Sequence, residues 1–452
     1  MTSDEIGEVD PELLGWIEAV MGAAVVRATR LVGGNRRQAW SVDVERGPPL
    51  FLRYASGSGW QGADPYTLQR EAALYRALSG TVAAMPRIIA THPQRPALLT
   101  ERVEGESRYA GSASSEVLDA VATDLMRKLA QLHALDIRGL GLPGYLPHGT
   151  ITDHVRAELG IWQAMYQEVS SRDPLIEFAL NWLADSIPET SDPPVVVHGD
   201  AGPGNFLHRN GKVTALIDWE LCHVGDPMED IAWLSVRSTF EPFPDFRRIV
   251  RDYAGFAARS IARDRLLYHR VFVPLRITVL RHRALGADAP DGDLANSLLS
   301  RTMNRRLLVE SLAAATGVSV AAVAAVQAPL PSVQKEYDYI LNLLRDKISS
   351  RTRDEVARAA IKSAARMVKY LANAHRYGEE IEAAGIRDLS SLLGVRATSR
   401  LALQAELIDR MKGGHLDQAT VLAFFSRDVA RETQLAAPAM GALADRTLPP
   451  FE

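Results

Sequence analysis

The chain has 452 residues but only one cysteine, Cys222, and it lacks a long run of strongly hydrophobic residues. A single cysteine excludes an intrachain disulfide framework and is typical of a reducing compartment, so we expect a cytoplasmic protein. Residues 311–329 carry no charge, but Ala, Gly, Ser and Thr dominate them. We therefore expect short helices broken near Gly317 there, and no membrane span. Residues 1–10 lack the basic start and apolar centre of a signal peptide, so we expect none.

The chain also lacks an excess of positive charge, because 51 Lys and Arg face 55 Asp and Glu, for a formal net charge of −4. This balance argues against a general nucleic-acid-binding protein, which needs a basic surface. A chain of this length exceeds one ordinary hydrophobic core, so we expect two or three domains. Pro329 and Pro331 interrupt the chain, and the pattern after Gln334 is helical.

Polar residues with catalytic chemistry follow two short apolar runs. The β-branched run Val195–Val197 predicts a buried strand, and Asp200 and Asn205 come soon after it. A second run, Val213–Ile217, leads directly to Asp218. Because two strands hold the intervening loop, we expect Asp200, Asn205 and Asp218 to converge at the strand ends.

These three residue types suit phosphoryl transfer. The carboxylate of Asp200 can accept a proton from a hydroxyl group. The amide oxygen of Asn205 and the carboxylate of Asp218 are hard oxygen ligands of the kind that Mg²⁺ prefers. A positioned nucleophile together with a metal that neutralises phosphate charge is what a phosphotransferase needs.

The same segment resembles a known superfamily. His198-Gly199-Asp200, followed by Asn205, resembles the HRD-x-x-x-x-N loop of protein kinases, and Asp218 stands where the DFG aspartate stands. With the GDP-x-x-D sequence that ends at Asp230, the chain is identified as a member of the aminoglycoside-phosphotransferase-like, or kinase-like, superfamily. The string DWELCHVGDPMEDIAW most resembles the branch that also occurs fused to acyl-CoA dehydrogenases.

This resemblance implies an α+β fold class: a bilobal protein-kinase-like fold, in which a small antiparallel β lobe precedes a mainly helical large lobe. An all-α bundle of unknown function follows. The predicted division is an N-terminal nucleotide-binding lobe over residues 1–104, a catalytic lobe over 105–328 and a helical domain over 333–452.

The resemblance also implies a nucleotide site in the small lobe. Gly33, Gly34 and Asn35 lie between two predicted strands, where the family has its nucleotide-covering loop; taken alone they would suit an ordinary hairpin turn. Arg53, on the third predicted strand, takes the place of the phosphate-contacting cation, and Glu71 on the next helix would orient it. The alternatives are a surface cation on an edge strand and an exposed helix glutamate.

Further residues receive supporting roles from the same resemblance. Glu101 and Val103 lie where kinase-like folds cross between lobes and hold adenine through backbone groups. His198 would hold the catalytic loop by hydrogen bonds, with proton transfer as the less favoured alternative. Asp226 and Asp230 would be acids around the metal, or, for Asp230 in particular, would cap a helix or brace the loop.

The function implied is an ATP- and Mg²⁺-dependent transfer of phosphate to a hydroxyl of a small molecule. Residues 264–283 combine arginines with aromatic residues. In the family this region lines the acceptor side, so a cationic face there favours an anionic acceptor such as a hydroxyacyl-CoA over a sugar, amino alcohol or aminoglycoside. The alternative for this segment is a solvated helix face.

A second hypothesis is a non-catalytic kinase-like module that binds nucleotide or acyl-CoA and acts through its helical tail. The intact Asp200, Asn205 and Asp218 argue against it, because such a module would not need all three. The helical tail could form a homodimer or dock on an acyl-CoA enzyme, and the sequence does not choose between these partners.

Overall fold

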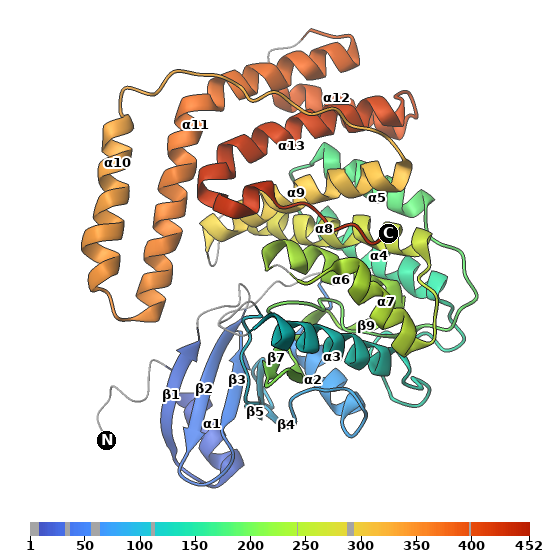
Figure 1. Ribbon diagram of the computed structural model, residues 1–452, viewed down its shortest axis with the longest axis vertical. Coiled ribbons are helices and arrows are strands. Elements are labelled where there is room, and N and C mark those ends of the chain that lie inside the picture. The colour runs from blue at the N-terminus through green and yellow to red at the C-terminus, as the bar shows by residue number, and fades with distance from the viewer. Residues whose placement is uncertain are drawn as a thin grey trace. The chain divides into compact units, whose positions relative to one another are not determined.

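The computed structural model describes residues 9–31, 37–55, 64–109, 114–241, 243–286, 293–396 and 399–452 (Figure 1). The predicted loop residues Gly33, Gly34 and Asn35 lie outside these ranges. The chain forms two compact units, which are treated separately below. The first comprises residues up to 161, residues 189–262 and the last four residues; the second comprises residues 162–188 and 263–448.

A five-stranded antiparallel sheet opens the first unit, with strand order β1-β2-β3-β5-β4 (Figure 1). Side chains alternate across it, because successive residues of a strand point to opposite faces. Leu50 and Leu52 of β3 are buried in a cluster with Leu13 and Ile17 of the first helix, and Arg53 therefore points to the other face. The elements are α1 (Pro11–Met21), β1 (Val25–Leu31), β2 (Gln38–Val44), β3 (Leu50–Tyr54), α2 (Leu68–Leu78), β4 (Ile88–Thr91) and β5 (Ala97–Glu101).

Two short antiparallel strand pairs carry the predicted catalytic segment of the first unit. The predicted strand Val195–Val197 pairs with the strand His223–Gly225, which follows Asp218 in the chain. This pairing holds the two ends of the segment together. The elements are α3 (Ser115–His133), β6 (Val195–Val197) paired with β9 (His223–Gly225), β7 (Phe206–Arg209) paired with β8 (Lys212–Leu216), a 3-10 turn η1 (Trp219–Leu221), α6 (Pro227–Phe240) and α7 (Phe246–Ala257). The antiparallel β lobe and the helical remainder confirm the predicted fold class.

In its described residues, the second unit contains helices and connecting segments but no strand. The helix α9 packs against both α8 and α13. The second unit therefore includes helices from before and after residues 328–333, where the sequence predicts a domain boundary. That boundary stays a prediction. The elements are the end of α4 (Ile151–Gln167), α5 (Pro174–Asp185), α8 (Arg263–Leu285), α9 (Leu294–Thr316), α10 (Gln334–Asn342), short turns to Arg351, α11 (Glu355–Leu393), α12 (Arg400–Lys412), α13 (Gln418–Met440) and η4 (Gly441–Asp445).

A buried ionic network fastens α13 to the other helices of this unit. Arg305 on α9 pairs with Asp173, which also caps α5 through Leu175 N–H at 3.0 Å. The same guanidinium donates to Glu432 on α13 at 2.8 Å. Because both Asp173 and Arg305 are buried, losing one of them would leave an uncompensated charge inside the unit.

The uncharged segment 311–329 differs from its prediction in one respect. The helix α9 runs to Thr316 and ends at Gly317, whose φ of 71° is the left-handed conformation that terminates helices. Residues 318–331 then form neither helix nor strand, so the second short helix expected after Gly317 is absent from this described stretch. Among all the described residues, none of the helices combines the length and apolarity that crossing a bilayer would require.

The arginine-rich helix α8 is not a solvated helix face, so that alternative is wrong. Arg270, Arg276 and Arg283 are buried in the described structure. The guanidinium of Arg276 lies 4.0 Å from the ring centroid of Phe272, and Arg283 donates to Glu168 at 2.5 Å. These arginines therefore pack within their own helical unit, and a role beside an acceptor stays a prediction.

Candidate active site

The predicted catalytic loop, residues 198–205, follows β6, and one buried carboxylate of α6 binds it. Asp230 accepts hydrogen bonds from the backbone N–H groups of His198 and Gly199, both at 2.9 Å. The Nε2 atom of His133 donates to the same carboxylate at 3.0 Å. Asp230 thus braces the loop, which is one of the three roles predicted for it, and fixes the starting direction of the segment that carries Asp200.

Two glycines let this loop lie directly against neighbouring backbone and side chains. Gly199 has a φ of 78°, and a Cβ there would lie 2.3 Å from the carbonyl oxygen of Leu221. Gly202 has a φ of 142°, and its Cβ would lie 2.6 Å from the Cβ of Arg237. Both positions require glycine, since other residues combine an unfavourable φ with a clash. The close approach brings Asp200 next to η1 and α6.

Asp200 forms a bidentate ion pair with Arg237 of α6. The carboxylate accepts from Nε of Arg237 at 2.7 Å and from its Nη2 atom. Sequence reasoning missed Arg237, although a signal for it existed. Residues seven apart share a helix face, so Arg237 lies on the same side of α6 as Asp230, which braces the loop.

The environment of Asp200 sets its protonation. Burial raises the pKa of Asp200 to about 6, although the guanidinium of Arg237 opposes this change. A carboxyl with this pKa is mostly ionised at neutral pH and can accept a proton there. It loses that ability as the pH falls through about 6.

We expect the pH dependence of ATP turnover to report this carboxyl. The rate should fall toward acid with a midpoint near pH 6, as Asp200 becomes protonated. Arg237→Met removes a positive charge that favours the carboxylate, so the pKa of Asp200 rises and the midpoint moves to higher pH. Arg237→Lys keeps a cation and should leave the midpoint closer to that of the wild type. Identical pH profiles for all three proteins would exclude control of Asp200 by Arg237.

On the other side of the site, Arg53 joins the small lobe to Asp218, the predicted metal ligand. Its Nη1 atom donates to Oε1 of Glu71 at 2.7 Å, and its Nη2 atom donates to Oδ1 of Asp218 at 2.9 Å. The side chain of Arg53 is 14% exposed and that of Glu71 is inaccessible. These values exclude the alternatives of a surface cation and an exposed helix glutamate.

A second arginine, Arg37, also binds Glu71 and was missed by sequence reasoning. It pairs with Oε2 of Glu71, donates to the Tyr66 carbonyl at 2.6 Å and lies 3.3 Å from a carboxylate oxygen of Glu220. Arg37 directly precedes β2, at the end of the predicted nucleotide-covering loop, and this place in the chain was the available signal. Together, Arg37 and Arg53 face three carboxylates, those of Glu71, Asp218 and Glu220.

Arg37→Ala should destabilise the first unit and weaken nucleotide binding. Glu71 would keep only Arg53 as a cationic partner inside a buried site, and breaking such a pair costs about 3 kcal/mol. Chemical denaturation should show the lower free energy of unfolding, and a titration with ATP should show the weaker binding. Arg27→Ala is the matched control, because Arg27 pairs with Asp43 on the exposed side of the same sheet. Equal stability of the two variants would contradict the role of Arg37.

The predicted metal ligands lie on the segment between the catalytic loop and η1. Nδ2 of Asn205 donates to the Asp200 carbonyl at 2.9 Å, which fixes the direction of its amide oxygen. Asp218 adopts a φ of 65°, and its side chain is 35% exposed. Although burial opposes its charge, the guanidinium of Arg53 lowers the pKa of Asp218, so it is ionised at neutral pH.

This donor set fits Mg²⁺ in chemistry and in number. Mg²⁺ is usually held by one or two protein oxygen ligands, with substrate phosphates and water completing its shell. Within the part of the chain that the structure describes, no group of three His, Cys, Asp or Glu residues forms a closed metal cage. Asn205 and Asp218 would supply two oxygen ligands, and nucleotide phosphates and water would complete the shell.

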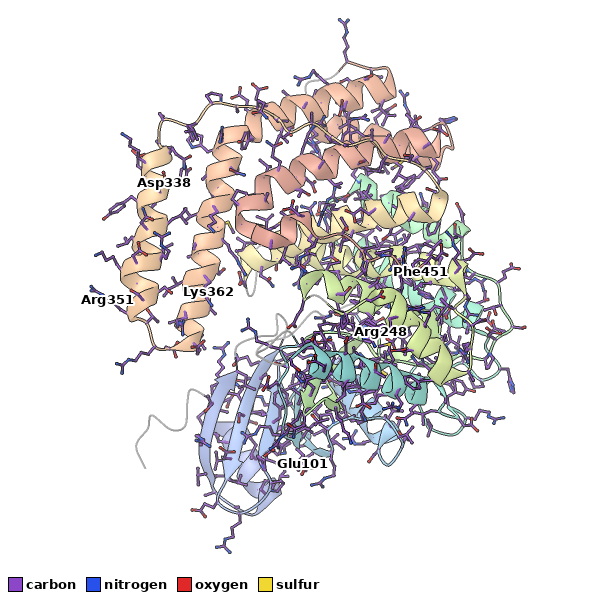
Figure 2. The ribbon with its side chains drawn as sticks, viewed as in Figure 1. Glu101, Arg248, Asp338, Arg351, Lys362 and Phe451 are labelled. Carbon is purple, nitrogen blue, oxygen red and sulfur yellow. The ribbon has the colours of Figure 1, made fainter. Side chains whose placement is uncertain are left out.

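The remaining predicted residues occupy less central places. Burial lowers the pKa of His198, and its Nε2 atom donates to the Ile217 carbonyl at 3.1 Å, so the ring links two site segments as a neutral group. Asp226 caps α6 by accepting from Met228 N–H at 2.9 Å. Glu101 ends β5 (Figure 2) and faces Arg87 at 3.2 Å; Val103 follows in the connecting segment, and adenine contacts there stay a prediction.

Comparison with known proteins decides the family. The model of the Phosphotransferase enzyme family (APH) matches residues 27–267, which include every site residue discussed above. The chain belongs to this family. Membership confirms the family that the sequence resemblance indicated, a phosphotransferase enzyme family.

The chain is also similar to individual proteins, over shorter stretches of sequence. The chain is 34% identical over 108 residues to acyl-CoA dehydrogenase family member 11 of Gallus gallus and 33% over 120 residues to that of Rattus norvegicus. These matches cover 23% and 26% of this chain, and 14% and 15% of those proteins. The chain thus spans about a seventh of the length of these relatives. Among solved structures, a candidate aminoglycoside phosphotransferase of Ralstonia eutropha JMP134 is 20% identical with a TM-score of 0.53, covering 68% of this chain and 98% of that one. At this identity the likeness shows the fold alone.

Proposed function

We propose that this family member transfers the γ-phosphate of ATP to a hydroxyl of a small molecule, with Asp200, Asn205, Asp218 and Arg53 as the central residues. The observation that carries the proposal is their convergence within one compact unit. Arg53 bridges Glu71 and Asp218, while Asn205 binds the backbone of Asp200. The two predicted metal ligands and the predicted base thus share one short stretch of structure.

The phosphate side of the site rests on Arg53. Glu71 holds one end of its guanidinium, and Arg37 holds Glu71 in turn. The planar fork of an arginine can bind two phosphate oxygens at once, which compensates for the absence of the lysine used by protein kinases. Asn205 and Asp218 would hold Mg²⁺, which neutralises charge on the phosphates when bound.

The acceptor side rests on Asp200. With a pKa of about 6, its carboxylate is ionised at neutral pH, and it would orient the acceptor hydroxyl and take its proton. Arg237 holds the carboxylate by two hydrogen bonds, which fixes its direction before the acceptor arrives. Because the transition state of phosphoryl transfer is loose, this positioning contributes more than base strength.

For the acceptor we favour a hydroxyacyl-CoA-like compound over a sugar or amino alcohol, and these over an aminoglycoside. Support comes from the similarity to acyl-CoA dehydrogenase family members, whose names refer to acyl-CoA. A cytoplasmic location and docking to an acyl-CoA enzyme belong to the same proposal. The location is supported by the single cysteine, Cys222, which is buried.

The test is transfer of labelled γ-phosphate from ATP to a panel of acceptors. The panel contains 3-hydroxyacyl-CoA thioesters, sugars, amino alcohols and aminoglycosides, each with the wild type and with Asp200→Asn. We expect label on a hydroxyacyl-CoA with the wild type only. Label on another class would overturn the acceptor preference. A protein that binds Mg²⁺-ATP but labels nothing, even water, would overturn the catalytic proposal in favour of a binding module.

A further inference from the structure

The predicted catalytic loop contains no lysine or arginine. Between Asp200 and Asn205, residues 201–204 are Ala, Gly, Pro and Gly, whose side chains cannot donate a hydrogen bond. The transition state of phosphoryl transfer spreads negative charge over the oxygens of the transferred group, and cations beside those oxygens stabilise it. The phosphate side of the site has Arg53, whereas the acceptor side has no cation within its own loop.

The helix α6 places Arg237 directly against this stretch of the loop. A Cβ on Gly202 would lie 2.6 Å from the Cβ of Arg237, so the absence of a side chain admits the arginine. A Cβ on Gly204 would lie 3.6 Å from the Nη1 atom of Arg237. Because Gly204 directly precedes Asn205, one nitrogen of the guanidinium lies beside the backbone that leads to a predicted metal ligand.

The nitrogen beside Gly204 is still able to bind a further group. The Nε and Nη2 atoms of Arg237 both donate to Asp200. Among the residues that the structure describes, none accepts a hydrogen bond from Nη1, and this atom is not enclosed. The side chain of Arg237 is 27% exposed, although that of Asp200 is only 11% exposed. Arg237 thus holds Asp200 with two nitrogens and leaves the third accessible.

The charge of Arg237 also acts on the predicted metal ligand. Although burial opposes it, the pKa of Asp218 is lowered by the guanidinium of Arg53 and, next in strength, by that of Arg237. Electrostatic effects of this kind weaken with distance, so Arg237 lies near Asp218 as well as near Asp200. A group placed between the metal ligands and Asp200 would therefore have this guanidinium as a neighbour.

We propose that Arg237 is a catalytic residue whose Nη1 atom would donate to an oxygen of the transferred phosphoryl group. This inference rests on the proposed function. In that reaction the acceptor oxygen bonds to the γ-phosphorus, the bond from phosphorus to the oxygen of ADP breaks, and Asp200 takes the hydroxyl proton. Arg237 keeps its own protons and neutralises charge that grows on the transferred oxygens. The same side chain would thus hold the base and stabilise the transition state.

Single-turnover transfer from ATP measures the contribution of Arg237. Arg237→Met should lower the maximal rate about 10²-fold, even at a pH where Asp200 is fully ionised in both proteins. The KM for the acceptor should change little, because the contact forms with the transferred group and not with the acceptor. Arg138→Met is the control, since Arg138 is 81% exposed in the same unit, and it should keep the wild-type rate. A raised KM with an unchanged maximal rate would overturn the proposal.

Binding of a transition-state mimic separates this role from the support of Asp200. Aluminium fluoride with Mg²⁺-ADP imitates the transferred group, and its binding requires no proton acceptor. Calorimetric titration should show that Arg237→Met weakens this binding at least about tenfold and leaves Mg²⁺-ADP binding unchanged, also in the Asp200→Asn background. An arginine that acts only through Asp200 would have no effect in that background. Either that result or an equal loss of Mg²⁺-ADP binding would overturn the proposal.

Arg237→Lys tests whether a positive charge alone is sufficient. A single ammonium group cannot hold Asp200 and also present a separate donor, so the maximal rate should stay about tenfold below that of the wild type. A wild-type rate in this variant would overturn the proposal. A wild type that transfers no phosphate would overturn the proposed function and this inference with it. An active wild type that Arg237→Met leaves unchanged would overturn the inference alone.

Discussion

Asp218→Asn lowers the rate of Mg²⁺-dependent ATP turnover by about 10³-fold or more while the protein stays folded. The substitution removes a charge that pairs with Arg53 at 2.9 Å and that would bind the metal. Asparagine is the suitable replacement, because Asp218 has a φ of 65° and asparagine tolerates this left-handed conformation better than alanine. The rate of phosphate release from ATP, measured at saturating Mg²⁺, checks the prediction.

The control for this variant must separate the lost charge from a general disturbance. Asp136→Asn removes an exposed carboxylate of the same unit that pairs with Arg138 at 2.8 Å, outside the site. It should turn over ATP at the wild-type rate. Turnover by folded Asp218→Asn within tenfold of the wild type would contradict the assignment of the metal.

Asp200→Asn should lower phosphoryl transfer by about 10² to 10⁴-fold while Mg²⁺-ATP still binds. The amide cannot accept a proton, but its oxygen can still accept a hydrogen bond from Arg237, so the loop keeps its position. Single-turnover kinetics gives the transfer rate, and calorimetric titration gives the binding of Mg²⁺-ATP.

The two variants differ in their expected signatures. Loss of Asp218 should remove both metal-dependent binding and transfer, whereas loss of Asp200 should remove transfer alone. If Asp200→Asn weakened binding as strongly as Asp218→Asn, Asp200 would belong to the metal site instead of the acceptor side. Unchanged transfer in Asp200→Asn would exclude it as the base.

Local patterns predicted the parts of the site that depend on strands and loops. Leu50 and Leu52 of β3 are buried and Arg53 points to the other face, as strand alternation allows, whereas the role of Arg53 was inferred from the family resemblance. The convergence of Asp200 and Asp218 followed from the two apolar runs that flank the loop. Such inferences succeed because strand periodicity and chain connectivity are local properties.

Contacts between segments that lie far apart in the sequence could not be predicted in the same way. Arg237 reaches Asp200 because α6 crosses above the loop, and Arg37 reaches Glu71 because of the position of α2 against the sheet. The burial of Arg276 also depends on packing, here against Phe272 and Trp162. The sequence does not show which partner will compensate the charge of a given side chain. The burial of a charged residue therefore cannot be predicted from sequence patterns.

Thermal unfolding with ATP, with and without Mg²⁺, tests the central claim most directly, because a ligand that binds only the native state raises the midpoint. The claim is that Asn205 and Asp218 hold the metal of a nucleotide-bound site. We predict a Mg²⁺-dependent rise for the wild type that is lost in both Asn205→Ala and Asp218→Asn and retained in Asp200→Asn. The absence of a Mg²⁺-dependent rise in the wild type, or an undiminished rise in both metal-site variants, would contradict the account.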